Sequence, residues 1–217
     1  MRARISTISK MKSELAALCA ALVASLAAGA ALAAAETATP PDSAKALIEK
    51  TVVQVLAVLR DESRTTAQQR LELEKIAHTR FDFRTMARLV LARDWKRLDS
   101  AKRDEFVDQF TTYLANDYGS RLERYQQEDV KVMDEQPKPR GDVEVRTKIV
   151  GGKNNGAIVD YRMRKDKDGS WRIIDVVIEG ISLVANFRDQ FREVIANGGP
   201  EALLQKLKEK NAAAAAA

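Results

Sequence analysis

The segment from Trp171 to Ile178 is apolar on both of its faces and leads directly into a helical pattern. A strand with one face in water alternates apolar and polar residues, and this segment does not. After a turn at Gly180, the side chains of Leu183, Phe187 and Phe191 recur every four residues, a spacing that only a helix brings onto one face. The fold must therefore supply apolar neighbours on both sides of this strand.

The first 35 residues have the composition of a secretory signal peptide. Four basic residues within positions 1–12 precede an Ala/Leu/Val run from Leu15 to Leu32, and small alanines follow. An uncleaved membrane anchor is the alternative, since the apolar run approaches the ~20 residues that span a bilayer. The alanine at the cleavage position favours removal, so we predict a cleaved signal peptide at residues 1–35.

Removal of residues 1–35 changes the composition of the chain. The only cysteine, Cys19, is lost, so the mature chain must be stabilised by its core without a disulfide. The leader also holds four of the 36 basic and one of the 31 acidic residues, and its loss leaves a net charge of +2. That charge is too small to indicate a nucleic-acid-binding protein. We expect a flexible lead-in at 36–42, a single domain at 43–211 and an alanine tail at 212–217.

Helical periodicity fills the first half of the mature chain. We predict a helix from Ser43, a second one around residues 71–76, and a short one capped by Asp82. A long helix with an N-cap at Ser100 carries an aromatic and leucine stripe that ends at Tyr125.

From about residue 129 the pattern changes to the alternation of strands. Segments at 130–132, 143–149 and 158–163 precede the strand at 171–178, and short polar turns join them, which is typical of antiparallel neighbours. The helix after Gly180 is predicted to stop at 197–200 and a last helix to follow. The sequence predicts an α+β fold with N-terminal helices, a four-stranded antiparallel meander and C-terminal helices that fold back.

The mature chain lacks the residue patterns of common enzymes. It has one histidine, His78, and no cysteine, so a zinc or iron site built on these residues is not expected. It contains no G-x-G-x-x-G, Walker A or G-x-S-x-G motif. Asp175 and Glu179 lie at the strand end, where we expect them to hold the Gly180 turn and to cap the helix at Ser182. We predict no catalytic residue, metal or cofactor.

Two stretches together resemble the MlaC family of periplasmic lipid-binding proteins, also called the toluene-tolerance family. The first is FDFRTMARLVL at 81–91, followed by Trp95 and the aromatic helix at 106–125. The second is the pattern W-x3-D-x3-E-G-x-S from Trp171 to Ser182, followed by the helix of Phe187 and Phe191. The resemblance covers residues 43 to 211.

The resemblance implies a periplasmic phospholipid carrier with a cone-shaped, cystatin-like or nuclear-transport-factor-like fold and a deep apolar pocket for acyl chains. It implies transient membrane contact and shuttling between an outer-membrane lipoprotein/porin complex and an inner-membrane ABC lipid transporter with a substrate-binding ring. It implies no cofactor and no nucleic acid. A hopanoid-associated lipid carrier is one alternative. Another is a secreted hydrolase or isomerase on the same fold, with Asp175, Glu179 or His78 as acid or base.

We predict packed helices on one face of the 171–178 strand. The other face is predicted to line a cavity for lipid tails, which the aromatics around Trp95, Phe106 and Phe110 close. Gly180 is expected either to act as a hinge for lipid release or to form a tight turn that needs a positive φ. The side chains predicted to contact lipid are the large apolar ones on these elements: Phe83, Met86, Leu89, Val90, Trp95, Phe106, Phe110, Leu114, Tyr118, Val145, Tyr161, Met163, Trp171, Ile173, Val177, Ile181, Val184 and Phe187.

Overall fold

The computed structural model describes residues 43–122 and 128–216, and in the last turn before the gap (118–122) only the backbone. The predicted signal peptide and lead-in, Tyr125 and the side chain of Tyr118 lie outside this description. Among the described residues, no helix combines the length and the apolar character needed to span a membrane.

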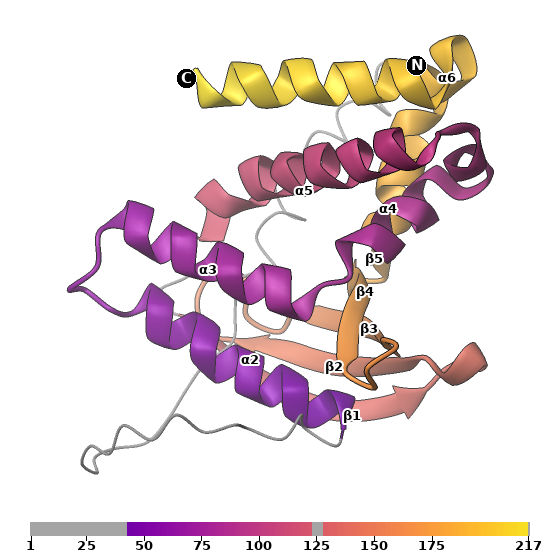
Figure 1. Ribbon diagram of the computed structural model, residues 1–217. Coiled ribbons are helices and arrows are strands. Elements are labelled where there is room, and N and C mark those ends of the chain that lie inside the picture. The colour runs from indigo at the N-terminus through magenta and orange to yellow at the C-terminus, as the bar shows by residue number, and fades with distance from the viewer. Residues whose placement is uncertain (1–42, 123–127, 217) are drawn as a thin grey trace, which may run out of the picture.

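Within the described residues, five helical segments precede the sheet (Figure 1). They are α2 (Ala44–Leu59), α3 (Thr66–Arg80), α4 (Phe83–Leu91), the 3-10 helix η1 (Ala92–Arg97) and α5 (Ser100–Leu122). The side chains of Ser43 and Asp82 accept hydrogen bonds from the first turns of α2 and α4, as predicted from the sequence. The cap of α5 differs, because the carboxylate of Asp99 and not the hydroxyl of Ser100 accepts the Lys102 N–H at 2.8 Å.

The sheet is an antiparallel meander of five strands in the order β1-β2-β3-β4-β5. The strands are β1 (Asp129–Pro137), β2 (Val143–Val150), β3 (Ile158–Lys165), β4 (Trp171–Ile178) and β5 (Ile181–Ser182), with the 3-10 turn η2 (Pro139–Gly141) between the first two. The fifth strand was not predicted. It forms because Glu179 and Gly180 both adopt positive φ, 48° and 80°, in a two-residue turn that folds the chain back onto β4.

The last helix, α6 (Leu183–Ala215), is bent where the sequence predicts a break. Gly199 has φ 75°, and Pro200 restarts the helix after it. Ser182 caps the helix by accepting the Ala185 N–H at 3.0 Å, as predicted. The predicted alanine tail instead continues α6 as far as Ala215, consistent with the high helix propensity of alanine.

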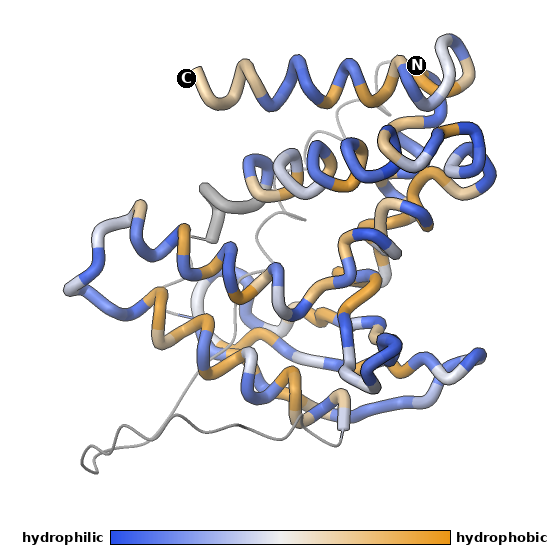
Figure 2. Tube along the Cα trace, in the orientation of Figure 1, coloured by the Kyte–Doolittle hydropathy of each residue, from blue (hydrophilic) through white to orange (hydrophobic). Residues whose placement is uncertain are grey.

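The start of α6 contacts β4 and β5, whereas α5 and the part of α6 after its bend lie farther from the sheet (Figure 1). Helix α2 contacts β1 and β2, whereas α3 and α4 contact β4. The apolar residues of α2, α4 and α6 form stripes along the tube, separated by polar residues (Figure 2). This arrangement gives each strand an inner face toward the helices and an outer face away from them.

Candidate functional site

The inner face of the sheet is a continuous apolar surface. Val145 pairs with Tyr161, and Met163 pairs with Ile173, so that all four lie on the same face. Val145, Met163 and Ile173 are at most 1% exposed, and Tyr161 is 8% exposed. They join α2, α4, α5 and α6 in one hydrophobic cluster. Four of the predicted lipid-contacting residues are therefore brought together here.

Val177, also predicted to contact lipid, lies on the other face. The register pairs it with Asp160, while its neighbour Val176 pairs with Tyr161. Val177 is buried, yet it is outside the cluster formed by the inner-face residues. The period of two in a strand thus divides the predicted set, because adjacent residues of β4 point in opposite directions.

The predicted aromatic residues of α5 and α6 form a tight group between these two helices. Phe110 contacts the ring edges of Phe187 and Phe191, with centroids 5.5 and 6.3 Å away, and stacks on Phe106 at 6.0 Å. Phe106 and Phe110 are fully buried. Leu114 and Val184 are also buried and belong to the same hydrophobic cluster. This group joins α5 to the first half of α6 and is continuous with the apolar inner face of the sheet.

The predicted residues of α4 and η1 divide between the interior and the surface. Met86 and Val90 are buried, whereas Phe83 and Leu89 are half-buried against the same cluster. Trp95 is half-buried, and the guanidinium groups of Arg84 and Arg103 each lie 5.7 Å from its ring centroid. Its position is therefore fixed by cation–π contacts at the surface.

Trp171 and Ile181 lie at the two ends of the β4–β5 unit, and both are half-buried. The ammonium group of Lys165 lies 5.2 Å from the Trp171 ring centroid, while the buried indole Nε1 has no hydrogen-bond partner. An indole with one charged neighbour and an unpaired donor lies at the border between apolar interior and polar surface.

The outer face of the sheet is a row of ion pairs, which corrects the prediction that the second face of β4 lines a lipid cavity. Arg146 holds Asp160 through two hydrogen bonds of 2.7 and 3.0 Å, and Arg162 bridges Glu144 and Asp175 at 3.2 Å each. The side chains of Arg146 and Arg162 are 43% and 45% exposed, so covering this ladder with acyl chains would cost the hydration of both guanidinium groups. The pattern of β4 shows only one member of this ladder, Asp175, since the other charges come from β2 and β3.

Asp175 is engaged by the start of α6. Its carboxylate accepts hydrogen bonds from Ser182 Oγ at 2.6 Å, Val184 N–H at 3.1 Å and Arg162 at 3.2 Å, and the residue is only 4% exposed. Glu179 accepts the Ile158 N–H across the sheet. The predicted contact with the start of the helix is present for Asp175, whereas Glu179 ties the turn to the first residue of β3 instead.

His78, the third group considered as an acid or base, is exposed, and its ring lies edge-on to Phe83 at 5.5 Å. In the described part of the chain, no three His, Cys, Asp or Glu side chains gather in a way that could hold a metal ion.

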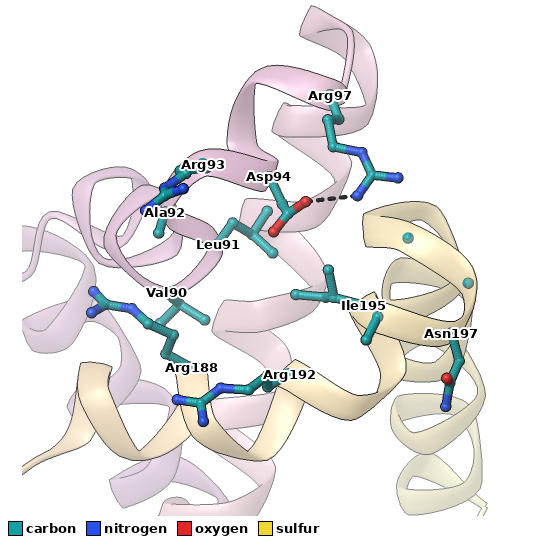
Figure 3. A pocket seen from close by; sticks show the side chains of 13 residues that line it. Val90, Leu91, Ala92, Arg93, Asp94, Arg97, Arg188, Arg192, Ile195 and Asn197 are labelled. Carbon is teal, nitrogen blue, oxygen red and sulfur yellow. Dashed lines mark hydrogen bonds and ion pairs between the residues drawn. The ribbon is translucent and has the colours of Figure 1, made fainter.

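The described surface includes the two following hollows. The larger, of about 610 Å³, lies between α4, η1 and α6 and is lined by four arginines (Figure 3). The smaller, of about 360 Å³, lies at η2. Of the predicted lipid-contacting residues, only Val90 lines either hollow. The arginines were not singled out from the sequence, although their density between residues 84 and 97 is a signal that charge patterning could have detected.

Comparison with known proteins gives a match to a family model and matches to solved structures. The family model described as MlaC protein matches residues 49–209. A solved structure of a phospholipid-binding protein from Ralstonia solanacearum, in complex with a phospholipid, is similar to this chain with a TM-score of 0.70 and 25% sequence identity. The match covers 79% of this chain and 98% of that protein.

Proposed function

The chain belongs to the MlaC family, and we propose that it is a phospholipid carrier that encloses acyl chains between the inner face of its sheet and its helices. The observation that carries this proposal is the apolar inner face formed by Val145, Tyr161, Met163 and Ile173, with helices on the same side. The phospholipid bound by the Ralstonia protein supports the ligand class.

The energetics of lipid transfer require such an enclosed surface. Burial of one methylene contributes about 0.8 kcal/mol, so two chains of ~30 methylenes in total represent on the order of 24 kcal/mol. A carrier that removes this lipid from a bilayer must return nearly all of that free energy. Contact at the protein surface cannot do so, whereas an apolar pocket that covers both chains can.

The lipid-contacting set is revised in one respect. We assign the inner-face residues, together with the group of Phe106, Phe110 and Phe187, to the pocket wall, and we leave out Val177 because it faces the ion-pair ladder. Tyr118 stays in the proposed set on the resemblance alone.

Location and partners follow from the family and are part of the proposal. We propose that the protein is exported to the periplasm after cleavage at about residue 35. There it shuttles lipid between an outer-membrane lipoprotein/porin complex and an inner-membrane ABC transporter. The hydrolase and isomerase alternatives lose support because Asp175, their most buried candidate, already accepts three hydrogen bonds within the chain.

Mass spectrometry of the organic extract of purified protein tests the proposal. We expect intact phospholipid in near-stoichiometric amount. Lysolipid with free fatty acid would instead indicate hydrolysis, and a hopanoid would indicate the related carrier. A protein that elutes without lipid and takes up none from vesicles would contradict the proposal.

Release of lipid is proposed to use the β4–β5 turn as a hinge. A disulfide between Cys substituted for Val177 and Ser182, which pair directly across this turn, would hold β5 to β4. We expect the oxidised variant to transfer lipid more slowly than the reduced variant between donor and acceptor vesicles. Equal rates would place the opening elsewhere in the molecule.

A further inference from the structure

The larger hollow is a positively charged site on the outside of the helical layer. Four arginines and a single aspartate line it, which gives a net charge of +3. The arginines come from two parts of the chain: Arg93 and Arg97 from η1, and Arg188 and Arg192 from α6. Leu91 and Ile195 lie between these two pairs and give the hollow an apolar floor (Figure 3).

Two of these arginines are held in place by the backbone and by a neighbouring carboxylate. Arg188 donates two hydrogen bonds to the Leu89 carbonyl, at 3.1 and 2.6 Å, and so ties α6 to α4. Arg97 donates to Asp94 at 2.7 Å and lies against the kink of α6, where a Cβ on Gly199 would be 3.1 Å from its guanidinium group. Side chains fixed in this way lose little conformational entropy when they bind.

The positive charges of the other two arginines make little or no contribution to the stability of the fold. Arg93 makes no hydrogen bond or ion pair with any described residue. Arg192 pairs only with Asp189, three residues before it on an exposed helix face, a pair that contributes little to stability. Neither guanidinium therefore has a structural role that explains its place beside the hollow.

We propose that this hollow is a docking site for an acidic segment of a partner protein. Its volume of about 610 Å³ lies within the range of roughly 300 to 1,000 Å³ that is typical of ligand-binding pockets. Because it is concave, a protruding segment can enter it, whereas a flat membrane surface cannot. Planar guanidinium groups bind carboxylates through paired hydrogen bonds, and arginine is enriched at protein interfaces. The apolar floor accepts an apolar side chain between the acidic residues.

The proposal goes beyond lipid binding, because the arginines of the hollow and the pocket-wall residue Phe187 lie on opposite sides of α6. Val90 lines the hollow as well but is buried. Arg188 and Arg192 are exposed, whereas Phe187 and Phe191 on the same helical turns are buried against α5. A partner in the hollow would contact η1 and the kink at Gly199 together. Docking and lipid content are therefore measurable independently.

The test is a titration of isotopically labelled protein, followed by amide resonances, with a hexapeptide of alternating glutamate and leucine as probe. We expect shifts confined to residues 89–97 and 188–199. In the Arg93→Ala/Arg192→Ala variant, we expect the Kd to rise about tenfold or more, because two interfacial charges are removed. The same peptide with glutamine in place of glutamate should not bind.

A matched control pair is Lys50→Ala/Arg64→Ala. Lys50, like Arg93, has no partner among the described residues, and Arg64, like Arg192, pairs with an aspartate three residues before it. Both lie on the α2 side of the molecule, and their loss should leave the Kd within about twofold. Arg93→Ala alone serves as a second test variant, since no described contact is lost with it.

Three results would overturn the proposal. The first is equal peptide affinity in the hollow and control variants. The second is arginine-dependent binding to phosphatidylglycerol vesicles without peptide binding, which would make the hollow a membrane contact. The third is full displacement of the peptide by millimolar inorganic phosphate, which would make it a site for a small anion. The lipid content of the variants should equal that of the unchanged protein in every case.

Discussion

On the inner face of the sheet Val145, Tyr161 and Met163 are buried against other apolar side chains, whereas on the outer face their chain neighbours Glu144 and Arg162 form an ion-pair ladder. The two faces of the same strands, the inner layer and the outer layer, are therefore stabilised by different interactions. Burial of apolar area drives the inner layer. The outer layer gains modest electrostatic energy in high dielectric and depends on salt and pH.

This difference indicates where the protein tolerates amino-acid substitutions. The inner layer determines both folding and the shape of the proposed pocket, so substitutions there have two consequences. In the outer layer Asp175 differs from the other charged residues, because it connects the ion-pair ladder to the first turn of α6. The following predictions test this contrast from the largest expected effect to the smallest.

Val145→Asp should produce the largest loss of stability. Val145 is fully buried on the inner face, and an aspartate there has no cationic partner among its apolar neighbours. We expect a loss of about 4 kcal/mol or more in the free energy of unfolding, measured by urea denaturation.

Lys148→Glu is the outer-face control on the same strand. Lys148 is exposed and lies directly opposite Lys131, so the change replaces a like-charge pair with an opposite-charge pair. It should leave stability unchanged or raise it slightly. A loss comparable to that of Val145→Asp would mean that the two faces do not differ as described.

Asp175→Ala should be the most damaging change on the outer face. It removes the acceptor for Ser182 Oγ, the Val184 N–H and Arg162, and leaves a buried N–H unsatisfied. We expect a loss of about 2 to 3 kcal/mol together with faster amide hydrogen exchange in the first turn of α6.

Asp160→Ala provides the comparison for Asp175→Ala. Asp160 is equally buried, but its described hydrogen bonds come from Arg146 and not from α6. Its loss should cost less and leave exchange in α6 unchanged. If both variants loosen α6 alike, the ladder acts as one unit and Asp175 has no separate role.

How far the sequence predicted these features depends on how local they are. The caps at Ser43, Asp82 and Ser182 and the break before Pro200 were predicted, because each depends on a few adjacent residues. The fifth strand was missed because it has two residues, too few for an alternating pattern.

The site was predicted less completely, since it depends on register. Which face of β4 carries Val177 is decided by its pairing with Asp160, seventeen residues earlier in the chain, and no local pattern encodes that pairing. The arginine hollow likewise combines η1 with α6, about ninety residues apart. The α+β class and the family resemblance were correct because they rest on element order and on contiguous motifs.

Tyr161→Trp and Val177→Trp test the contrast through lipid content. The larger ring at position 161 enters the inner face and should reduce the lipid bound per protein by about half or more, at a cost of no more than about 1 to 3 kcal/mol. Tryptophan at position 177 places a larger side chain on the outer face and should leave the lipid content unchanged. Lipid is measured by phosphorus assay of the purified proteins. Loss of lipid only in Val177→Trp would reverse our assignment of the two faces.

The smallest expected effect is the pH dependence that Glu144 gives to the outer ladder. Burial raises the pKa of its carboxyl, but hydrogen bonds from Lys138 and Arg162 outweigh burial, so that in the folded protein the pKa lies below its ordinary value of 4.5. A lowered folded pKa adds stability above the unfolded pKa, and that stability is lost as the pH falls through the folded value. Glu144→Gln should therefore destabilise the protein by about 0.5 to 1 kcal/mol at neutral pH, and the difference should shrink below pH 4.5. Denaturation curves at neutral and acidic pH measure this difference. The control is Glu72→Gln on the surface of α3, which loses only its Lys75 pair. A difference that stays constant down to about pH 3 would mean that Glu144 acts through its shape and not through its charge.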